Sequence, residues 1–271
     1  GLNLLGSMQD HVEKYFEHPK LQQILQYTLV FLGGSPTNTP ALYNLMSHVD
    51  FNLGVFYPDG GMGSVVDGVA TLGEELGVTY RTGDPVTAIE GFRGGFSVRT
   101  ASDAYPADVV VSDADYAHTE RDLLPPEKRQ FDESYWDSRT YAPSAFMLYL
   151  GVEGEVPSLE HHTLVLPGDW DRHFETIFDD PAWPADPAYY VSVTSQTDDE
   201  VAPDGHSTVV VLVPIAADLE DTPEHGVVVL TTVNALLQRV PPRDKLRPRV
   251  LSATPGDQFA PERLTAFFAE H

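Results

Sequence analysis

The sequence predicts an α+β fold in which helices pack on an antiparallel or mixed sheet, with a smaller βα element in the first half of the chain. Two observations support this fold class. Apolar side chains recur at helical spacing in much of the segment 8–77, whereas long apolar runs rich in valine and aromatic residues dominate residues 142–216. Loops rich in proline, aspartate and glycine separate these runs, as is typical of strands in an antiparallel sheet.

Helices are predicted first over residues 8–33, with a break at Pro19 and an end at Gly33. Residues 35–49 begin with serine, threonine and proline and predict another short helix. The clearest helix runs from Met62 to Leu76, because Gly77 follows at the position of a C-terminal cap.

Strands are predicted for two groups of segments. Short segments rich in valine and threonine follow the Met62 helix, at 78–83, 85–91, 95–101 and 107–114. Longer apolar runs lie at 144–152, 161–167, 188–196 and 207–215. The longer runs predict a largely antiparallel sheet, buried on both faces where the polar alternation disappears. Residues 169–178 and 226–240 are predicted to be helical.

The composition narrows the class of protein. The 271 residues, 42% of them apolar, can bury a core of one large domain or two smaller ones. Acidic residues outnumber basic ones 41 to 16, so a nucleic-acid partner is not expected. So acidic a surface predicts a halophilic protein from a high-salt cytoplasm, and the alternative is an acidic mesophilic protein.

The absence of cysteine excludes disulfides and thiolate catalysis. Since no apolar run is long enough to cross a bilayer, we expect a cytoplasmic protein, soluble or peripherally bound to a membrane.

Few motifs point to a specific chemistry. The stretch "GMGSVV" at residues 61–66 holds two of the three glycines of a dinucleotide fingerprint, and Asp84 follows near the position of a ribose-binding acid. Valine replaces the third glycine, and "PDG" before the motif is turn chemistry, so a tight turn is favoured over a phosphate site. We expect His161 and His162 to point to opposite faces of a strand and to bind no metal. No G-x-S-x-G nucleophile elbow is present.

Taken together, the block from "GGSPTNTPALYNLMSHVDF" through "YPDGGMGSVVDGVATLGEELG" to "DPVTAIEG" resembles the phytoene desaturase family, the bacterial-type carotenoid desaturases that use FAD. The likeness continues in "PADVVVSDADYAHTERDLLP", "HHTLVLPGDWDRHFETIFDDP" and "VSVTSQTDDEVAPDGHSTVVVLVPI", in the family's order. Because the family's opening G-x-G-x-x-G loop and its glycine-rich closing segment are not in this sequence, the resemblance implies an internal fragment. Whether such a truncation is natural or engineered stays open.

The resemblance implies the substrate domain of an amine-oxidase-like flavoprotein plus a partial FAD-domain βα element. It divides the chain into a helical part of the substrate domain (1–56), a partial FAD-binding element (57–115), the sheet of the substrate domain (116–240) and a return segment towards the FAD domain (241–271).

The same resemblance implies which residues form the site. Those expected to contact FAD are Gly60, Gly61, Met62, Val86, Asp113 and Ala114. Those expected to contact substrate are Tyr57, Phe146 and Tyr149, although most aromatic residues should belong to the core. No catalytic residue is assigned, since spacing does not select among Asp59, Asp113 and His118.

The activity implied for the complete protein is dehydrogenation of an apolar C40 polyene, with a hydride passing to FAD. We expect peripheral membrane contact through an apolar patch near the N-terminal helices, and we expect the fragment alone to be inactive and to retain no FAD. A carotenoid ketolase, saturase or isomerase is an alternative, as is a non-enzymatic lipid-binding module. The particular carotenoid, the number of desaturations, the electron acceptor and the oligomeric state stay open.

Overall fold

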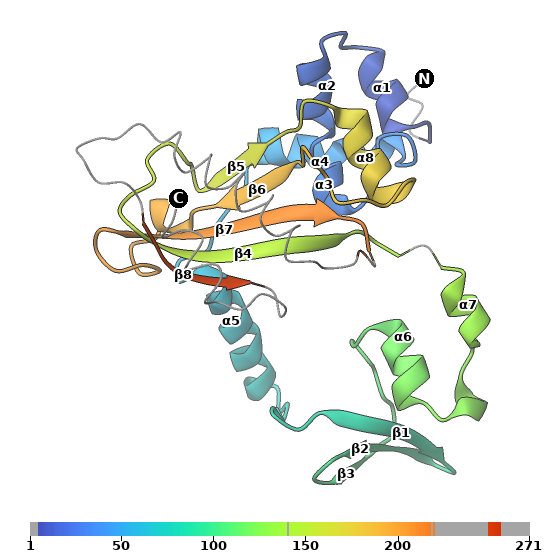
Figure 1. Cartoon of the computed structure of the whole chain (residues 1–271). Helices are drawn as coiled ribbons and strands as arrows, with labels where there is room; N and C mark the ends of the chain where they lie inside the picture. The colour runs from blue at the N-terminus through green and yellow to red at the C-terminus, as the bar shows by residue number, and fades with distance from the viewer. Residues whose placement is uncertain (1–4, 140, 218, 220–248, 256–271) are drawn as a thin grey trace. The chain divides into compact units, whose positions relative to one another are not determined.

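The computed structural model describes residues 5–139, 141–217, 219 and 249–255, and the chain divides into two compact units. The first unit comprises residues 1–65 and 142–271, and the second comprises residues 66–141. Each unit has its own antiparallel sheet, as Figure 1 shows. The division into four domains expected from the resemblance stays a prediction.

The first unit is built on a five-stranded sheet with the order β5-β6-β7-β4-β8. Its strands are β4 (Ser144–Glu153), β5 (His162–Val165), β6 (Tyr189–Ser192), β7 (His206–Ile215) and β8 (Arg249–Pro255). All pairings are antiparallel, and the longest runs from Ser144 opposite Ile215 to Glu153 opposite His206. The predicted sheet is therefore confirmed, and part of the expected return segment forms β8 at its edge.

The two faces of this sheet differ in burial. Leu148, Leu150 and Val152 on β4 pack with Val209, Val211 and Val213 on β7 in the main hydrophobic core. The intervening positions are less buried, and Tyr149 keeps 49% of its surface exposed. The expectation of burial on both faces is therefore wrong for these strands. Apolar residues at consecutive positions in the middle of both strands concealed an alternation that the packing shows.

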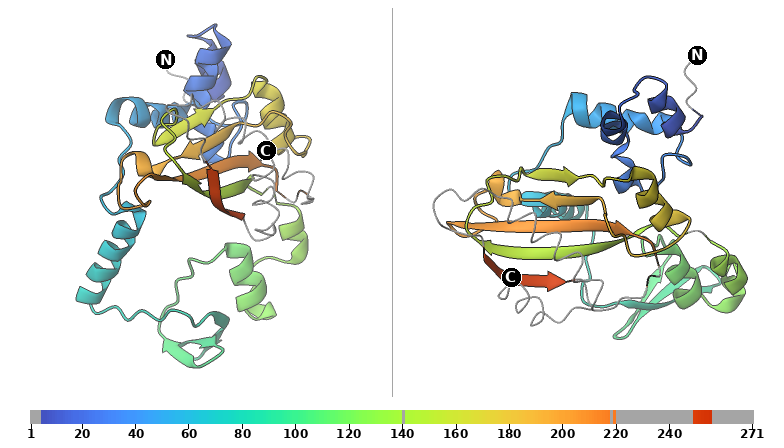
Figure 2. Two further views of the ribbon diagram at one scale, coloured as in Figure 1. Left: turned by 60° about the vertical axis from the view of Figure 1, so that its left-hand side comes forward. Right: turned by 45° about the horizontal axis from the view of Figure 1, so that its top comes forward.

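Helices cover the β5–β6 side of the sheet (Figure 2). They comprise α1 (Met8–Glu13), α2 (Pro19–Gln26), α3 (Leu29–Leu32), α4 (Asn44–His48) and α8 (Trp170–Phe178), with a 3₁₀ turn at Ala41–Tyr43 and a π-helical turn at Val49–Leu53. Proline begins α2 and Gly33 ends α3 with a φ of 74°, as predicted.

A second hydrophobic core joins these helices. Met8, Val12 and Leu29 pack against Trp170 and Phe174 of α8. The Trp170 indole donates a hydrogen bond of 2.8 Å to the Gln26 side chain, so the polar atom of this ring is satisfied within the core.

The helix α5 (Gly61–Glu75) starts in the first unit and continues into the second. It ends as predicted, because Gly77 has a φ of 86° and the Val78 amide donates to the Gly73 carbonyl at 2.9 Å. The second unit continues with the meander β1 (Val86–Phe92), β2 (Gly95–Thr100) and β3 (Ala104–Ala107).

Short helical segments complete the second unit: α6 (Tyr116–His118), a π-helical turn (Thr119–Leu123), a 3₁₀ turn (Pro126–Lys128) and α7 (Glu133–Asp137). The buried Glu120 carboxylate holds them together, because it accepts hydrogen bonds from the amides of Gln130 and Phe131 and from the Tyr116 hydroxyl.

Two predicted strands are wrong. Residues 78–83 are irregular, and β3 ends at Ala107, so residues 108–114 form no strand. Val109 and Val111 are 75% and 89% exposed, and no strand pairs with them in the part of the chain that the structure describes. A run of β-branched residues becomes a strand only where a partner completes its hydrogen bonds. The helix predicted at 226–240 lies outside the described residues.

Candidate functional site

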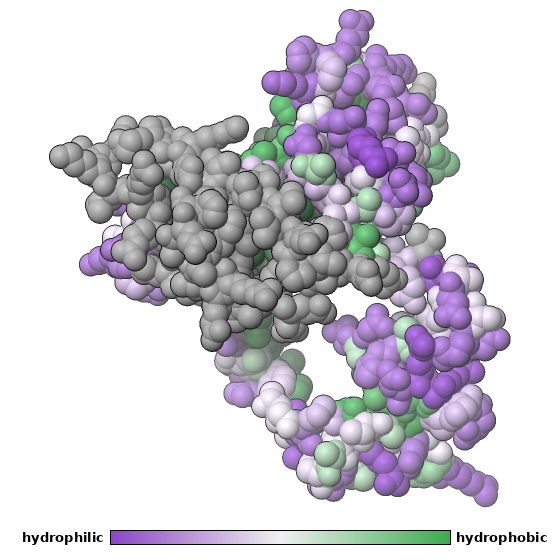
Figure 3. Space-filling view, in the orientation of Figure 1, coloured by the Kyte–Doolittle hydropathy of each residue, from purple (hydrophilic) through white to green (hydrophobic). Residues whose placement is uncertain are grey.

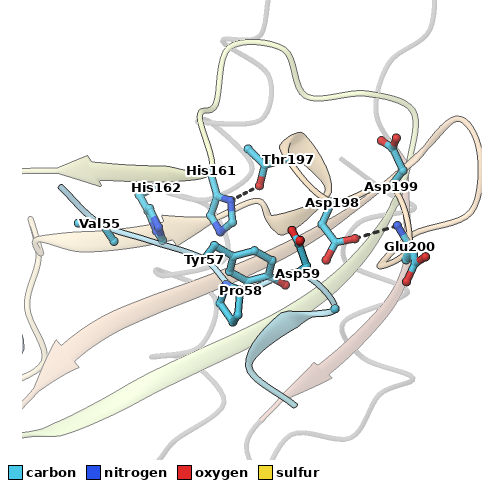
Figure 4. Close-up of a pocket in the computed structure, with 11 residues that line it drawn as sticks. Val55, Tyr57, Pro58, Asp59, His161, His162, Thr197, Asp198, Asp199 and Glu200 are labelled. Atoms are coloured by element: carbon cyan, nitrogen blue, oxygen red, sulfur yellow. Dashed lines mark hydrogen bonds between the residues drawn. The ribbon is translucent and has the colours of Figure 1, made fainter. Parts of the chain in front are cut away.

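A cavity of about 670 Å³ lies within the first unit. Three segments line it: Val55 and residues 57–60, the pair His161 and His162, and residues 197–200 (Figure 4). The first segment leads into α5, the second leads into β5, and the third follows the 3₁₀ turn Thr194–Gln196. The cavity thus brings together three parts of the chain that are distant in sequence.

Two glycines shape the turn that leads from the cavity into α5. Gly60 and Gly61 have φ angles of 78° and 77°, a backbone conformation that side chains disfavour. A Cβ atom on Gly61 would lie 3.0 Å from the Tyr57 hydroxyl oxygen. Nothing lies within 4 Å of the corresponding position at Gly63. The tight turn therefore requires the first two glycines and not the third.

Asp84 has a local role in the second unit. Its carboxylate accepts hydrogen bonds from the hydroxyls of Thr100, Ser102 and Tyr105 at 2.8–3.0 Å. These bonds, led by the one from Ser102, lower the pKa of Asp84. Its carboxylate thus fastens the segment before β1 to the β2–β3 hairpin.

The histidine pair differs from the prediction. His161 lies directly before β5, and its carbonyl accepts a hydrogen bond of 2.9 Å from the Val193 amide. The two rings nevertheless lie side by side and do not point to opposite faces. Their centroids are 4.3 Å apart, and both rings line the cavity. The Tyr57 ring contacts His161 edge to face, with 4.7 Å between centroids.

Each imidazole is held through its Nδ1 atom. His161 Nδ1 lies 2.5 Å from Thr197 Oγ1, and His162 Nδ1 lies 2.6 Å from the Tyr190 hydroxyl oxygen. Partial burial and the neighbouring His161 lower the pKa of His162. His162 is therefore neutral near pH 7.

Carboxylates give the cavity a strongly acidic lining. Asp59, Asp198, Asp199 and Glu200 all line it, and the Glu200 amide donates to Asp198 at 3.0 Å. Desolvation and the nearby Asp198 carboxylate raise the pKa of Tyr57, so this phenol keeps its proton at neutral pH. Among the described residues, no group of three or more His, Cys, Asp or Glu is arranged to hold a metal ion.

Aromatic contacts connect the cavity to the less buried face of the sheet. Tyr190, which holds His162, contacts Phe31 of α3 with 5.5 Å between ring centroids. Tyr190 also lies opposite Leu212 in the ladder, and Tyr149 lies opposite Val210 two positions earlier on the same face of β7. A surface of Tyr149, Val210, Leu212 and Tyr190 therefore extends across three strands towards His162; we call it the tyrosine face.

The residues expected to contact substrate do not all lie on the same face of the sheet. Tyr57 lines the cavity and Tyr149 lies on the tyrosine face. Phe146 lies on the opposite face, where it packs against the main core and contacts Trp183 at 6.2 Å between ring centroids. Phe146 and Tyr149 therefore cannot contact the same point of a ligand.

The residues expected to contact the cofactor are distributed over both units. Gly60 lines the cavity, Gly61 is buried beside Tyr57, and Met62 follows on α5 with 63% of its surface exposed. Val86 begins β1 in the second unit. Asp113 and Ala114 are exposed there, directly before Asp115, which caps α6.

The three candidate bases belong to different units. Asp59 lines the cavity, whereas Asp113 and His118 lie in the second unit, and His118 Nδ1 contacts Asp122 at 2.7 Å. The spacing of His161, His162 and Thr197 in the sequence does not indicate that they line one cavity. The doubled histidine at the start of a strand, "HHTLV", was the one local signal available.

Comparisons with known proteins agree on one family. The profile of the flavin containing amine oxidoreductases matches residues 5–254. A carotenoid 3,4-desaturase from Haloarcula japonica is 68% identical over 225 residues, which are 83% of this chain and 46% of that protein. A phytoene desaturase from Fusarium fujikuroi is 32% identical over 225 residues, 80% of this chain and 38% of that protein. The chain spans about half the length, or less, of these curated relatives.

Solved structures show the same fold at low sequence identity. An oxidoreductase from Methanosarcina mazei matches with a TM-score of 0.56 and 16% identity, over 92% of this chain and 56% of that chain. A putrescine oxidase bound to putrescine matches with a TM-score of 0.53 and 13% identity, over 94% of this chain and 54% of that chain. These matches confirm an α+β fold like that of flavin-dependent amine oxidases.

Proposed function

Because this chain belongs to the flavin containing amine oxidoreductase family, we propose that it is part of an FAD-dependent carotenoid desaturase. The enzyme would introduce conjugated double bonds into a C40 polyene by hydride transfer to the flavin. The observation that carries the proposal is the 68% identity to the carotenoid 3,4-desaturase of Haloarcula japonica over 225 residues, which include the cavity and the tyrosine face.

The residues around the Gly60–Gly61 turn fit a flavin. Neither glycine has a side chain, and the Met62 side chain is exposed, so a flat ring could approach the backbone there. We propose that Gly60, Gly61 and Met62 contact FAD, together with Val86, Asp113 and Ala114 of the second unit. When bound, FAD supplies the two-electron acceptor of the reaction.

The chain covers less than half of its 68%-identical relative, so we propose that FAD is held by the complete protein and not retained by this chain alone. Purified chain should therefore show no visible flavin absorbance after dialysis against FAD-free buffer. A stoichiometric flavin spectrum would contradict this.

The tyrosine face is the part of the sheet suited to an apolar substrate. Val210, Leu212 and Tyr190 are only partly buried there, and Tyr149 is half exposed. Burying a polyene against such a surface contributes about 25 cal/mol per Å² of apolar area removed from water. We propose that Tyr149 and Tyr57 contact the polyene directly, and that Phe146 supports this region from the opposite face.

An apolar substrate has to be drawn from lipid, and residues 42–56 of the first unit provide a surface for this. Exposed apolar side chains gather in this segment: Leu42, Tyr43, Leu45, Val49, Phe51, Leu53, Val55 and Phe56. No helix of the described chain is long and apolar enough to cross a bilayer. We propose that the protein is cytoplasmic and that this segment gives it peripheral membrane contact. The contact has to be apolar, because the net charge of -25 would repel anionic lipid.

Product analysis tests the function. The complete protein, loaded with FAD, is incubated with phytoene or a partly desaturated carotene in liposomes, and the polyene is analysed by absorbance and mass. We expect loss of two hydrogens per new double bond and a shift of absorbance to longer wavelength. An unchanged polyene would support a lipid-binding protein instead.

A second candidate function is oxygenation of the polyene. A 4,4'-diaponeurosporene oxygenase from Staphylococcus haemolyticus is 29% identical over 216 residues, 78% of this chain and 42% of that protein. Its lower identity places this candidate second. A product that gains oxygen would favour it over desaturation in the same experiment.

A further inference from the structure

We propose that His161 is the proton acceptor of this site, and that Thr197 and His162 position it. This inference rests on the proposed desaturase function. It names a residue for the removal of the proton, the half of the reaction that a flavin does not perform. The sequence alone does not select among Asp59, Asp113 and His118 for this role.

The chemistry requires such a residue. Converting a CH–CH unit into C=C breaks one C–H bond so that its electron pair leaves with the hydrogen as a hydride, which bound FAD would accept. The neighbouring C–H bond breaks so that its electron pair forms the second carbon–carbon bond, and its hydrogen leaves as a proton. A positioned side chain that takes such a proton typically contributes about 10²–10⁴-fold to the rate.

The cavity has a lining that an apolar polyene alone does not explain. Its walls carry two imidazoles, four carboxylates, a phenol and a threonine hydroxyl. It also adjoins the Gly60–Gly61 turn, where the flavin is proposed to lie, and the tyrosine face, where the polyene is proposed to lie. Polar groups between these two surfaces suit proton transfer better than substrate binding.

His161 is held in an orientation suited to a base. Its Nδ1 atom is engaged by Thr197 at 2.5 Å, and its ring is fixed between Tyr57 and His162. If Nδ1–H donates to the threonine oxygen, the lone pair of Nε2 is free to accept a proton. The contact with Thr197 thus holds the ring in one orientation, and the tautomer with its proton on Nδ1 is the one that can act as a base at Nε2.

His162 completes the arrangement as a neutral neighbour. Tyr190 holds it at 2.6 Å, and its lowered pKa keeps it uncharged when His161 gains a proton. Two imidazoles this close together carry one positive charge between them more readily than they carry two positive charges. The carboxylates of Asp59, Asp198, Asp199 and Glu200 in the same cavity offset that charge, while Tyr57 stays protonated.

A spectroscopic measurement on the chain itself tests the pair without any cofactor. The ring nitrogens of ¹⁵N-labelled histidines are titrated by NMR in the unsubstituted chain, in His161→Gln and in His206→Gln. His206 is a matched control, because its Nδ1 contacts the Asp204 carbonyl oxygen outside the cavity. We expect His161→Gln to raise the pKa of His162 and His206→Gln to leave it unchanged. An unchanged pKa of His162 in both variants would overturn the pairing.

Flavin reduction by the polyene in the complete, FAD-loaded protein tests the role in the reaction. We expect His161→Gln to lower the rate constant by about 10²–10⁴-fold and to change its pH profile, with His206→Gln unaffected. Imidazole should restore part of the rate in His161→Gly, since a cavity of about 670 Å³ accommodates it. Thr197→Val should also lower the rate, but by a smaller factor than His161→Gln. This variant keeps the proposal testable if a His161 variant does not fold.

The outcomes separate the two proposals. If unsubstituted protein desaturates the polyene and His161→Gln does so at the same rate with the same pH profile, His161 is not the proton acceptor and the desaturase function stands. If unsubstituted protein forms no double bond, the function itself is wrong, whatever the titration shows.

Discussion

His173 on α8 shows how burial changes the chemistry of a single residue. Only 3% of its surface is exposed, and its Nδ1 atom accepts a hydrogen bond of 3.4 Å from the Ala188 amide. Burial lowers its pKa to about 4, against the opposing effect of Asp186. The folded protein therefore holds this imidazole neutral, whereas the unfolded chain protonates it below about pH 6.5.

We predict acid sensitivity from this residue. Between about pH 6.5 and pH 4 the unfolded state binds one proton more than the folded state at His173, so stability falls as the pH falls. The loss reaches on the order of 3 kcal/mol at pH 4. Urea unfolding of His173→Asn and His206→Asn across this range measures it. The His173 variant should have the flatter pH profile, and equal slopes in both would contradict the prediction.

Tyr149 and Phe146 allow a test of the two sheet faces with neighbouring residues. Tyr149→Ala should raise the KM for the polyene several-fold and change stability little, because half of its side chain is exposed. Phe146→Ala should instead lower the free energy of unfolding, by about 2–4 kcal/mol, because this ring packs against the main core. Steady-state kinetics of the complete protein and thermal unfolding measure both. A larger loss of stability in Tyr149→Ala would reverse our assignment of the faces.

The turn into α5 is the element on which the candidate site depends most directly. We predict that Gly61→Ala costs about 1–2 kcal/mol, because alanine disfavours a φ of 77° and its methyl group would press on Tyr57. Gly63→Ala is the matched control two residues later. It should be neutral or stabilising by up to about 1 kcal/mol, since the position is helical and open. Thermal unfolding by circular dichroism compares them, and equal effects would show that the turn is not strained.

Elements with local signals were the ones that the sequence predicted well. Helix α5 has a regular apolar spacing and a glycine at its end, and both act within a few residues of each other. Residues 78–83 and 107–114 have strand-like composition. Yet neither segment forms a strand, apart from Ala107 at the end of β3. Strand formation depends on a partner elsewhere in the chain, which composition does not specify.

At the scale of the whole molecule, the acidic surface governs behaviour in salt. The helical layer of the first unit is mainly hydrophilic on the face shown in Figure 3, and the formal net charge is -25. The ion pairs of Arg99 with Glu90, Arg121 with Glu133 and Arg172 with Glu175 are exposed, so each adds little stability.

We therefore predict that molar KCl stabilises the chain, because salt screens the repulsion among its carboxylates. Unfolding temperatures should rise between 0.1 M and 2 M KCl. Comparing KCl with an equal osmolality of sucrose separates screening from general exclusion effects. Equal stability at both salt concentrations would contradict a halophilic protein.

The α+β class, helix α5, the acidic surface and the family resemblance could all be predicted from the sequence, because each depends on neighbouring residues or on composition. The apolar runs also indicated the strands β4, β5, β6 and β7, although β5 and β6 are only four residues long. The tertiary structure alone decided which face of β4 is buried and which residues share the cavity. Tyr57, His161 and Thr197 are more than 30 residues apart and meet only through strand pairing and the turn at Gly60. Side-chain spacing within a segment does not encode that register. It also did not predict that the rings of His161 and His162, consecutive residues at the start of β5, lie side by side.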